Sequence, residues 1–152
     1  MSMRNINAAR EIISTRVIDF PRELVWKAWT DPVHLATWWG PKGFTNTFHE
    51  FNLKPGGMWR FIMHGPDGKD YKNESLFVEV EENAWIVFNH ISAPQFQVTA
   101  TFVDCDGKTK IVFNMRFESA AACENMKPIC VPSNEQNFDR LEAELSRMKA
   151  LS

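Results

Sequence analysis

The sequence predicts one α+β domain, in which a curved seven-stranded antiparallel sheet surrounds a long C-terminal helix. Three observations support this. Apolar residues alternate with a period of two over much of residues 43–117, Gly- and Pro-rich turns divide that stretch, and helical spacing returns near the C-terminus. A one-sided helix must bury its apolar stripe, and we expect the apolar face of the sheet to receive it.

The first strand is predicted at Glu11–Ile18, which is rich in β-branched residues. Pro21 then favours a helix start, and apolar side chains recur at helical spacing over Arg22–Thr30. Asp31-Pro32 repeats the signal and begins a second short helix, which Gly40-Pro41 ends. We therefore expect two short helices in tandem after the first strand.

Six further strands are expected in the alternating region. Turn sequences such as Pro55-Gly56-Gly57 and Gly65-Pro66-Asp67-Gly68 separate them, which indicates an antiparallel meander. The predicted strands are Phe44–Leu53, Met58–His64, Glu74–Val80, Trp85–Ile91, Gln97–Asp104 and Thr109–Phe117.

The C-terminal helix is predicted to begin at Ser133, because Ser133 and Gln136 have the spacing of a capping box. For Ala120–Val131 we expect at most one or two helical turns before Pro128 breaks them. The apolar stripe of the helix consists of Phe138, Leu141, Leu145 and Met148.

Composition narrows the range of partners. The chain has 152 residues, with 17 Lys plus Arg against 19 Asp plus Glu, and 44% of it is hydrophobic. This is typical of a single soluble domain, here residues 1–152 with about eight flexible residues at the start. The balanced charge argues against nucleic-acid and membrane partners, and the absence of an apolar leader predicts a cytoplasmic protein.

No metal, cofactor or disulfide is predicted. Cys105, Cys123 and Cys130 are odd in number and form no C-x-x-C pair, and the four histidines lack metal-ligand spacing. The sequence also lacks the common hydrolase, zinc-protease and phosphate-loop motifs. Acid–base chemistry would have to use a polar residue on a strand, for which the candidates are His49, Glu50, His64 and, as first choice, His90.

The aromatic residues suggest ligand binding. There are 12 Phe and 6 Trp but one Tyr, so nearly all of the aromatic surface lacks a hydroxyl and suits burial or apolar contact. Either these side chains fill the interior completely, or they line a cavity between sheet and helix. The candidate lining residues are Trp39, Trp59, Phe61, Phe77, Phe88, Phe102, Phe113, Phe138 and Leu141.

Several motifs resemble one known family. They are TRVIDFPRELVWKAWTDP at residues 15–32, WWGPKGFT at 38–45, PGGMWRF at 55–61, GPDG at 65–68 and FDRL at 138–141. They are similar to the proteins named as homologues of the activator of the heat-shock protein ninety ATPase, in the START, polyketide-cyclase and pollen-allergen superfamily. The resemblance implies the helix-grip fold and a cavity that takes apolar ligands in many relatives, without a catalytic motif.

One departure from the family pattern bears on the cavity. Ser75 and Phe77 stand where relatives tend to have Gly and Tyr, so a tyrosine hydroxyl is missing and a drier cavity is expected.

Three functions follow from the residues and the resemblance together. We expect reversible binding of a small hydrophobic or aromatic molecule; the alternatives are a chaperone-binding module and a cyclase- or dehydratase-like enzyme that uses a cavity histidine.

Overall fold

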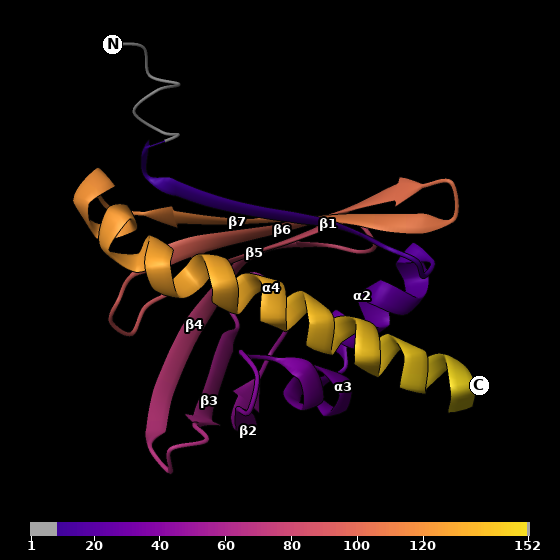
Figure 1. The fold of residues 1–152 in the computed structure, drawn as a ribbon, viewed down its shortest axis with the longest axis horizontal. Helices are drawn as coiled ribbons and strands as arrows, with labels where there is room; N and C mark the ends of the chain where they lie inside the picture. Colours follow the sequence, from indigo (N-terminus) through magenta and orange to yellow (C-terminus); the bar gives the residue numbers. More distant parts are fainter. Residues whose placement is uncertain (1–8, 152) are drawn as a thin grey trace.

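The computed structural model describes residues 9–151, and the expectation of a flexible segment before them lies outside the described residues. Residues 9–151 form one sheet, two short helices and one long helix (Figure 1). The elements are β1 (Glu11–Ile18), α2 (Arg22–Thr30), α3 (Pro32–Trp38), β2 (Thr45–Phe51), β3 (Met58–His64), β4 (Asp70–Glu81), β5 (Trp85–His90), β6 (Phe96–Cys105), β7 (Lys108–Phe117) and α4 (Ala120–Leu151).

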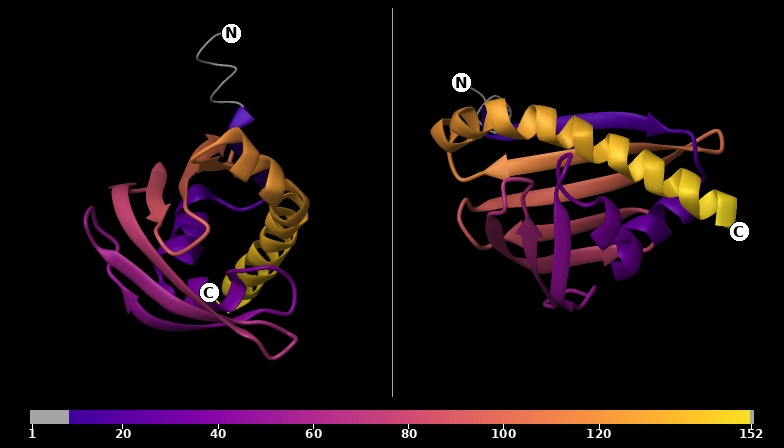
Figure 2. Two further views of the ribbon diagram at one scale, coloured as in Figure 1. Left: turned by 90° about the vertical axis from the view of Figure 1, so that its left-hand side faces the viewer. Right: turned by 60° about the horizontal axis from the view of Figure 1, so that its bottom comes forward.

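The sheet has seven strands in the order β1-β7-β6-β5-β4-β3-β2, and every neighbouring pair is antiparallel. Strands β2 to β7 therefore form the expected meander, and β1 joins it beside β7. Figure 2 shows the sheet curving around an interior that α4 closes along its open side. The predicted fold class is confirmed, including the two short helices after the first strand.

Strand alternation determines which side chains enter the interior. On β3, Trp59 and Phe61 are buried while Arg60 between them is exposed. Successive side chains of a strand point to opposite faces, so each strand contributes every second residue to the core. Strand β4 begins at Asp70, earlier than the predicted Glu74, because its first residues pair with the end of β3, as His64 with Asp70.

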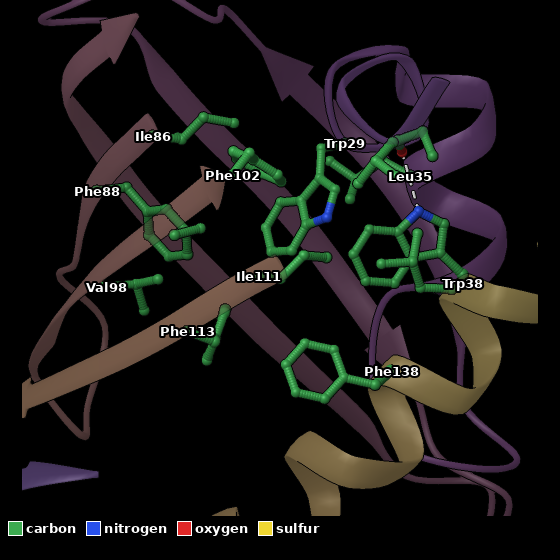
Figure 3. Close-up of a cluster of buried hydrophobic side chains, with 14 of the residues drawn as sticks. Trp29, Leu35, Trp38, Ile86, Phe88, Val98, Phe102, Ile111, Phe113 and Phe138 are labelled. Atoms are coloured by element: carbon green, nitrogen blue, oxygen red, sulfur yellow. Dashed lines mark hydrogen bonds between the residues drawn. The ribbon is translucent and has the colours of Figure 1, made fainter. Parts of the chain in front are cut away.

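Tryptophan and phenylalanine fill the end of the interior nearest α2 and α3 (Figure 3). The Trp29 ring lies 5.0 Å from that of Trp38 and 5.3 Å from that of Phe102, both edge to face. The buried Trp38 indole N–H donates a 2.9 Å hydrogen bond to the Ala28 carbonyl oxygen. This closely packed cluster fixes the two short helices against the sheet.

The predicted start of the C-terminal helix at Ser133 is wrong, because α4 already begins at Ala120. Ser119 caps it: its Oγ accepts from the Ala122 backbone N–H at 3.1 Å. Gln136 takes no part in a capping box, since its Oε1 accepts from the Lys42 N–H at 3.1 Å. The true cap is thus a single serine that precedes a run of alanines, a weaker pattern than the one at Ser133.

Pro128 and Pro132 lie inside α4 rather than breaking it. A proline in a helix leaves the carbonyl four residues earlier without its donor. Both prolines are exposed and are four residues apart on the same side of the helix, so the affected carbonyls at Glu124 and Pro128 lie toward water. Figure 1 shows the first turns of α4 at an angle to the rest of the helix.

Two further properties concern residues 9–151. No helix in this range is long and apolar enough to cross a membrane. No group of three or more His, Cys, Asp or Glu side chains within it is placed to hold a metal ion.

Candidate functional site

The aromatic side chains do not fill the interior completely. A cavity of about 150 Å³ remains between the concave face of the sheet, the loop after α3 and the middle of α4. Most of its wall is apolar. It is lined by Trp39, Gly40, Pro41, Trp59, Phe61, Met63, Asn73, Ser75, Phe88, His90, Phe96, Val98, Phe113, Met115, Ser133, Asn134 and Asn137.

Five of the nine predicted lining residues belong to this wall, namely Trp39, Trp59, Phe61, Phe88 and Phe113. The other four lie elsewhere in the core. Phe77 and Phe138 each border a separate void of about 10 Å³, too small for a ligand. Phe102 packs edge to face on Trp26 and Trp29, and Leu141 is fully buried.

A short row of polar side chains crosses the concave face within the apolar wall. Ser75 on β4 is the register partner of Trp59 on β3 and of His90 on β5. Side chains opposite each other on antiparallel strands are about 5 Å apart, so Ser75 is a direct neighbour of both Trp59 and His90 and lies between them. Ser75 and Trp59 are only 1% and 2% exposed, and neither the Ser75 hydroxyl nor the Trp59 indole N–H has a hydrogen-bond partner among the described residues.

His90 continues this polar row. Its Nδ1 lies 2.8 Å from the Pro94 carbonyl oxygen, and its Nε2 lies 2.8 Å from Oδ1 of Asn73. The ring stacks on Phe96 with 4.5 Å between centroids. Burial lowers the pKa of His90, against the opposing effect of its hydrogen bonds to the backbone at Pro94 and Ser92, so the imidazole is neutral near pH 7.

The helix side of the cavity carries two amides. Asn134 donates through Nδ2 to the Ser14 hydroxyl at 3.1 Å and to Met115 Sδ at 3.5 Å. Asn137 accepts at Oδ1 from the Gly40 N–H at 3.1 Å. Both residues also border the small void beside Phe138, so one face of α4 supplies the polar part of this wall.

Arg140 fixes the loop that forms the third wall. Its guanidinium donates to five backbone carbonyls at the end of α3 and in the loop before β2, at 2.8 to 3.2 Å: those of Thr37, Trp39, Gly40, Pro41 and Phe44. A guanidinium has five N–H donors in a rigid plane, which suits such a cluster of acceptors. Trp39, Gly40 and Pro41 line the cavity, so this contact from α4 sets the position of the wall.

The remaining polar candidates lie away from the cavity. His49 and Glu50 are exposed on β2, and Glu50 lies 3.6 Å from Arg60. His64 is 2.7 Å from Asp70 and from the Thr47 hydroxyl at the end of the β2–β3 pair. Of the four acid–base candidates, His90 alone lines the cavity, and no carboxylate from residues 9–151 accompanies it there.

The three cysteines are free thiols, and none lines the cavity. Cys105 is exposed at the end of β6, whereas Cys123 and Cys130 are buried in α4. Burial raises the pKa of Cys130 to about 11, which leaves it protonated and unreactive near neutral pH.

Sequence reasoning missed most of the polar lining. Asn134 and Asn137 escaped notice because the helix periodicity was traced through apolar residues only. Both fall three or four positions from Phe138 or Leu141, which places them on the buried side of α4. Ser75 had been singled out for replacing glycine, and its hydroxyl makes this wall more polar than the expected drier cavity.

A wider hollow lies on the other side of the His90–Phe96 stack. It is more polar than the cavity and measures about 440 Å³, and its wall includes Arg10, Asn89, Gln95 and Gln97. His90 and Phe96 border both spaces. This stacked pair therefore lies between the cavity and the polar hollow.

Comparison with solved structures gives close matches of fold at low sequence identity. A protein from Nitrosomonas europaea superposes with a TM-score of 0.88 at 20% identity, covering 95% of this chain and 99% of that one. A protein from Arthrobacter aurescens gives 0.84 at 22% identity, covering 92% and 88%. A protein from Mycobacterium smegmatis gives 0.77 at 22% identity, covering 93% and 91%.

Comparison with curated protein sequences gives no significant match. A family model, in contrast, matches residues 19–146, from the end of β1 almost to the end of α4. This range includes the motifs of the two short helices, the Gly56-Gly57 turn and the segment that carries Arg140. The chain therefore belongs to the family described as activator of Hsp90 ATPase homolog 1-like proteins.

Proposed function

We propose that the protein reversibly binds a small, mostly apolar molecule of about the size of one aromatic ring. The observation that carries this proposal is the cavity of about 150 Å³, whose wall is built largely from Trp, Phe, Met and Val side chains. Ligand sites in proteins are typically concave and apolar, with a few polar groups that orient the ligand.

The volume of the cavity limits the size of the ligand. An apolar cavity of about 150 Å³, engineered into another protein, stays dry and binds benzene. A sterol or a long-chain fatty acid is several times larger and would require the sheet and α4 to separate. The expected ligands therefore have one ring, or an aliphatic chain of comparable volume.

The experiment is a calorimetric titration with toluene, and with cholesterol and palmitate as large apolar controls. We expect saturable binding of toluene with a stoichiometry of one, and no specific binding of the larger two. Val98→Phe fills the cavity and should abolish toluene binding, whereas Val103→Phe adds the same ring at an exposed position and should not. Absence of toluene binding by the folded wild-type protein would overturn the proposal.

Chaperone binding is the second candidate function, and family membership is the observation that favours it. The test is the steady-state ATPase rate of Hsp90 with and without the protein at several-fold molar excess. A change in rate would support this function, whereas an unchanged rate would remove it. The cavity-filled Val98→Phe variant separates the two functions, because a surface interaction does not need the cavity.

A further inference from the structure

We infer that the ligand carries one uncharged hydroxyl group, as in phenol, and that this hydroxyl lies against the polar row of Trp59, Ser75 and His90. The inference rests on the proposed function and specifies the class of ligand. It comes from three side chains whose hydrogen-bonding groups are incompletely satisfied and that are neighbours across β3, β4 and β5.

The Ser75 hydroxyl is the first of these groups. It is buried in the cavity wall and has no partner among residues 9–151. A buried hydroxyl without a hydrogen bond destabilises the folded protein, and alanine would fill the same space without this cost. A ligand that bonds to Ser75 would recover the lost hydrogen bond.

The His90 ring is the second group, because its two nitrogens face more acceptors than a neutral imidazole can donate to. The two oxygens closest to its ring nitrogens, the Pro94 carbonyl and the Asn73 Oδ1, are both acceptors at 2.8 Å, and the Ser92 hydroxyl lies farther away, 3.4 Å from Nε2. The Asn73 amide is oriented by its own Nδ2, which donates to the Tyr71 carbonyl at 3.0 Å. A neutral imidazole has one N–H, so it bonds to one of the two close oxygens and faces the other with an unprotonated nitrogen. For Nε2 the Ser92 hydroxyl is a possible donor, at a distance that is long for a hydrogen bond.

Trp59, in contrast, has a hydrogen-bond donor that needs an acceptor. Its indole nitrogen is a donor only, is buried, and has no acceptor among the described residues. The row therefore contains an unused donor at Trp59, a hydroxyl at Ser75 that can donate or accept, and a ring nitrogen at His90 that can accept a closer hydrogen bond than the 3.4 Å contact with the Ser92 hydroxyl. A hydroxyl is the smallest uncharged group that both donates and accepts, so it can complete this row.

Charge distinguishes a hydroxyl from a carboxylate. No Lys, Arg, Asp or Glu among residues 9–151 lines the cavity, and the imidazole of His90 is neutral. A carboxylate would be buried there without a counter-charge, which is strongly unfavourable. An arylcarboxylate such as benzoate should therefore bind much more weakly than a neutral alcohol of the same size.

The test compares phenol, toluene and benzoate by calorimetric titration at about pH 7.5. In a wholly apolar cavity phenol would bind more weakly than toluene, because its hydroxyl must leave water without a new partner. We expect phenol to bind at least as tightly as toluene, and benzoate at least about tenfold more weakly than phenol.

Ser75→Ala identifies the group responsible. We expect the variant to bind phenol about fivefold to tenfold more weakly than the wild type does, with toluene affinity changed less than about twofold. Thr109→Val is the matched control, because it removes another buried hydroxyl that does not line the cavity. It should leave the affinities for both ligands unchanged.

Three results would overturn the inference, and they differ in what they imply. If toluene binds but phenol binds much more weakly, and Ser75→Ala changes neither affinity, the hydroxyl assignment is wrong while the proposed function stands. If neither toluene nor phenol binds to the folded protein, the proposed function fails as well. Tight benzoate binding would contradict the assignment of an uncharged head group.

Discussion

Arg140 on α4 donates a 2.8 Å hydrogen bond to the carbonyl oxygen of Gly40, 100 residues earlier in the chain. Gly40 has a φ of +100°, and a Cβ added there would lie 2.7 Å from the Met63 methyl group. The loop can thus turn sharply against the cavity only because residue 40 is glycine. The Arg140–Gly40 contact joins α4 to the wall of the cavity. The shape of the cavity therefore depends on the packing of α4 against the loop after α3.

Removal of the Arg140 guanidinium should destabilise the protein strongly. Arg140→Ala removes a donor from five backbone carbonyls, of which those of Trp39 and Pro41 keep a second donor, so we expect a loss of about 3 kcal/mol in the free energy of unfolding, measured by urea denaturation. Arg60→Ala is the control, because Arg60 makes only exposed ion pairs and should cost less than about 1 kcal/mol. Equal losses in the two variants would show that the hydrogen bonds from Arg140 to the carbonyls stabilise the protein no more than exposed ion pairs do.

Ser75→Ala should not destabilise the ligand-free protein. Its hydroxyl is buried without a partner, so we expect unchanged stability or a gain of up to about 1 kcal/mol by urea denaturation. Thr109→Val removes a hydroxyl that donates to the Phe20 carbonyl at 2.8 Å, and should cost about 1–2 kcal/mol. A larger loss for Ser75→Ala than for Thr109→Val would mean that Ser75 has a partner that the structure lacks.

His90 should make the protein less stable in mild acid. Burial lowers the pKa of His90 below its ordinary value of 6.5, so as the pH falls through that value the unfolded chain takes up a proton that the folded protein does not. The free energy of unfolding should therefore decrease below about pH 6.5, and His90→Gln should decrease less. His49→Gln, at an exposed position, should retain the wild-type dependence; an unchanged profile in His90→Gln would contradict the argument.

Glu144 should control stability at lower pH. Burial alone would raise the pKa of this 4% exposed carboxylate, but hydrogen bonds from Arg147 and His34 outweigh that effect and hold the pKa below its ordinary value of 4.5. His34 lies 2.7 Å from Oε2 of Glu144, so the carboxylate joins α3 to α4.

A carboxyl group whose pKa is lower in the folded state stabilises the protein above the unfolded-state pKa and loses this effect as the pH falls. Glu144→Gln should therefore be less stable than the wild type at neutral pH, and the difference should shrink below about pH 4.5, as measured by thermal unfolding. Glu82→Gln, in an exposed turn, should follow the wild type throughout. A difference that is constant with pH would show that Glu144 acts through packing alone.

The fold was predictable because each part of it leaves a local signal. Strand alternation on β3 and β7 and the Asp31-Pro32 helix start depend on neighbouring residues, and they led to the correct order of elements. The start of α4 was misplaced because Pro128 was weighed as a helix breaker. Its cost depends on exposure of the freed carbonyl to water, which is a tertiary property.

The site was only partly predictable, because part of it depends on tertiary packing that leaves no local signal in the sequence. Trp39, Trp59, Phe61, Phe88 and Phe113 were named because large aromatic side chains on the concave face are visible as a pattern. Whether Phe77 and Phe138 line a usable space or a closed one depends on how closely their neighbours pack. The polar row at Ser75 depends on the register of three strands, which alternation within each single strand does not reveal.

The central claim is that the cavity accepts a single-ring molecule, and methionine methyl NMR tests it most directly. Met63 and Met115 line the cavity, whereas Met148 is buried in α4 outside it. In protein labelled with ¹³C at the methionine methyl groups, titration with toluene should shift the signals of Met63 and Met115 saturably and leave that of Met148 in place. Unmoved Met63 and Met115 signals at saturating toluene would contradict the account.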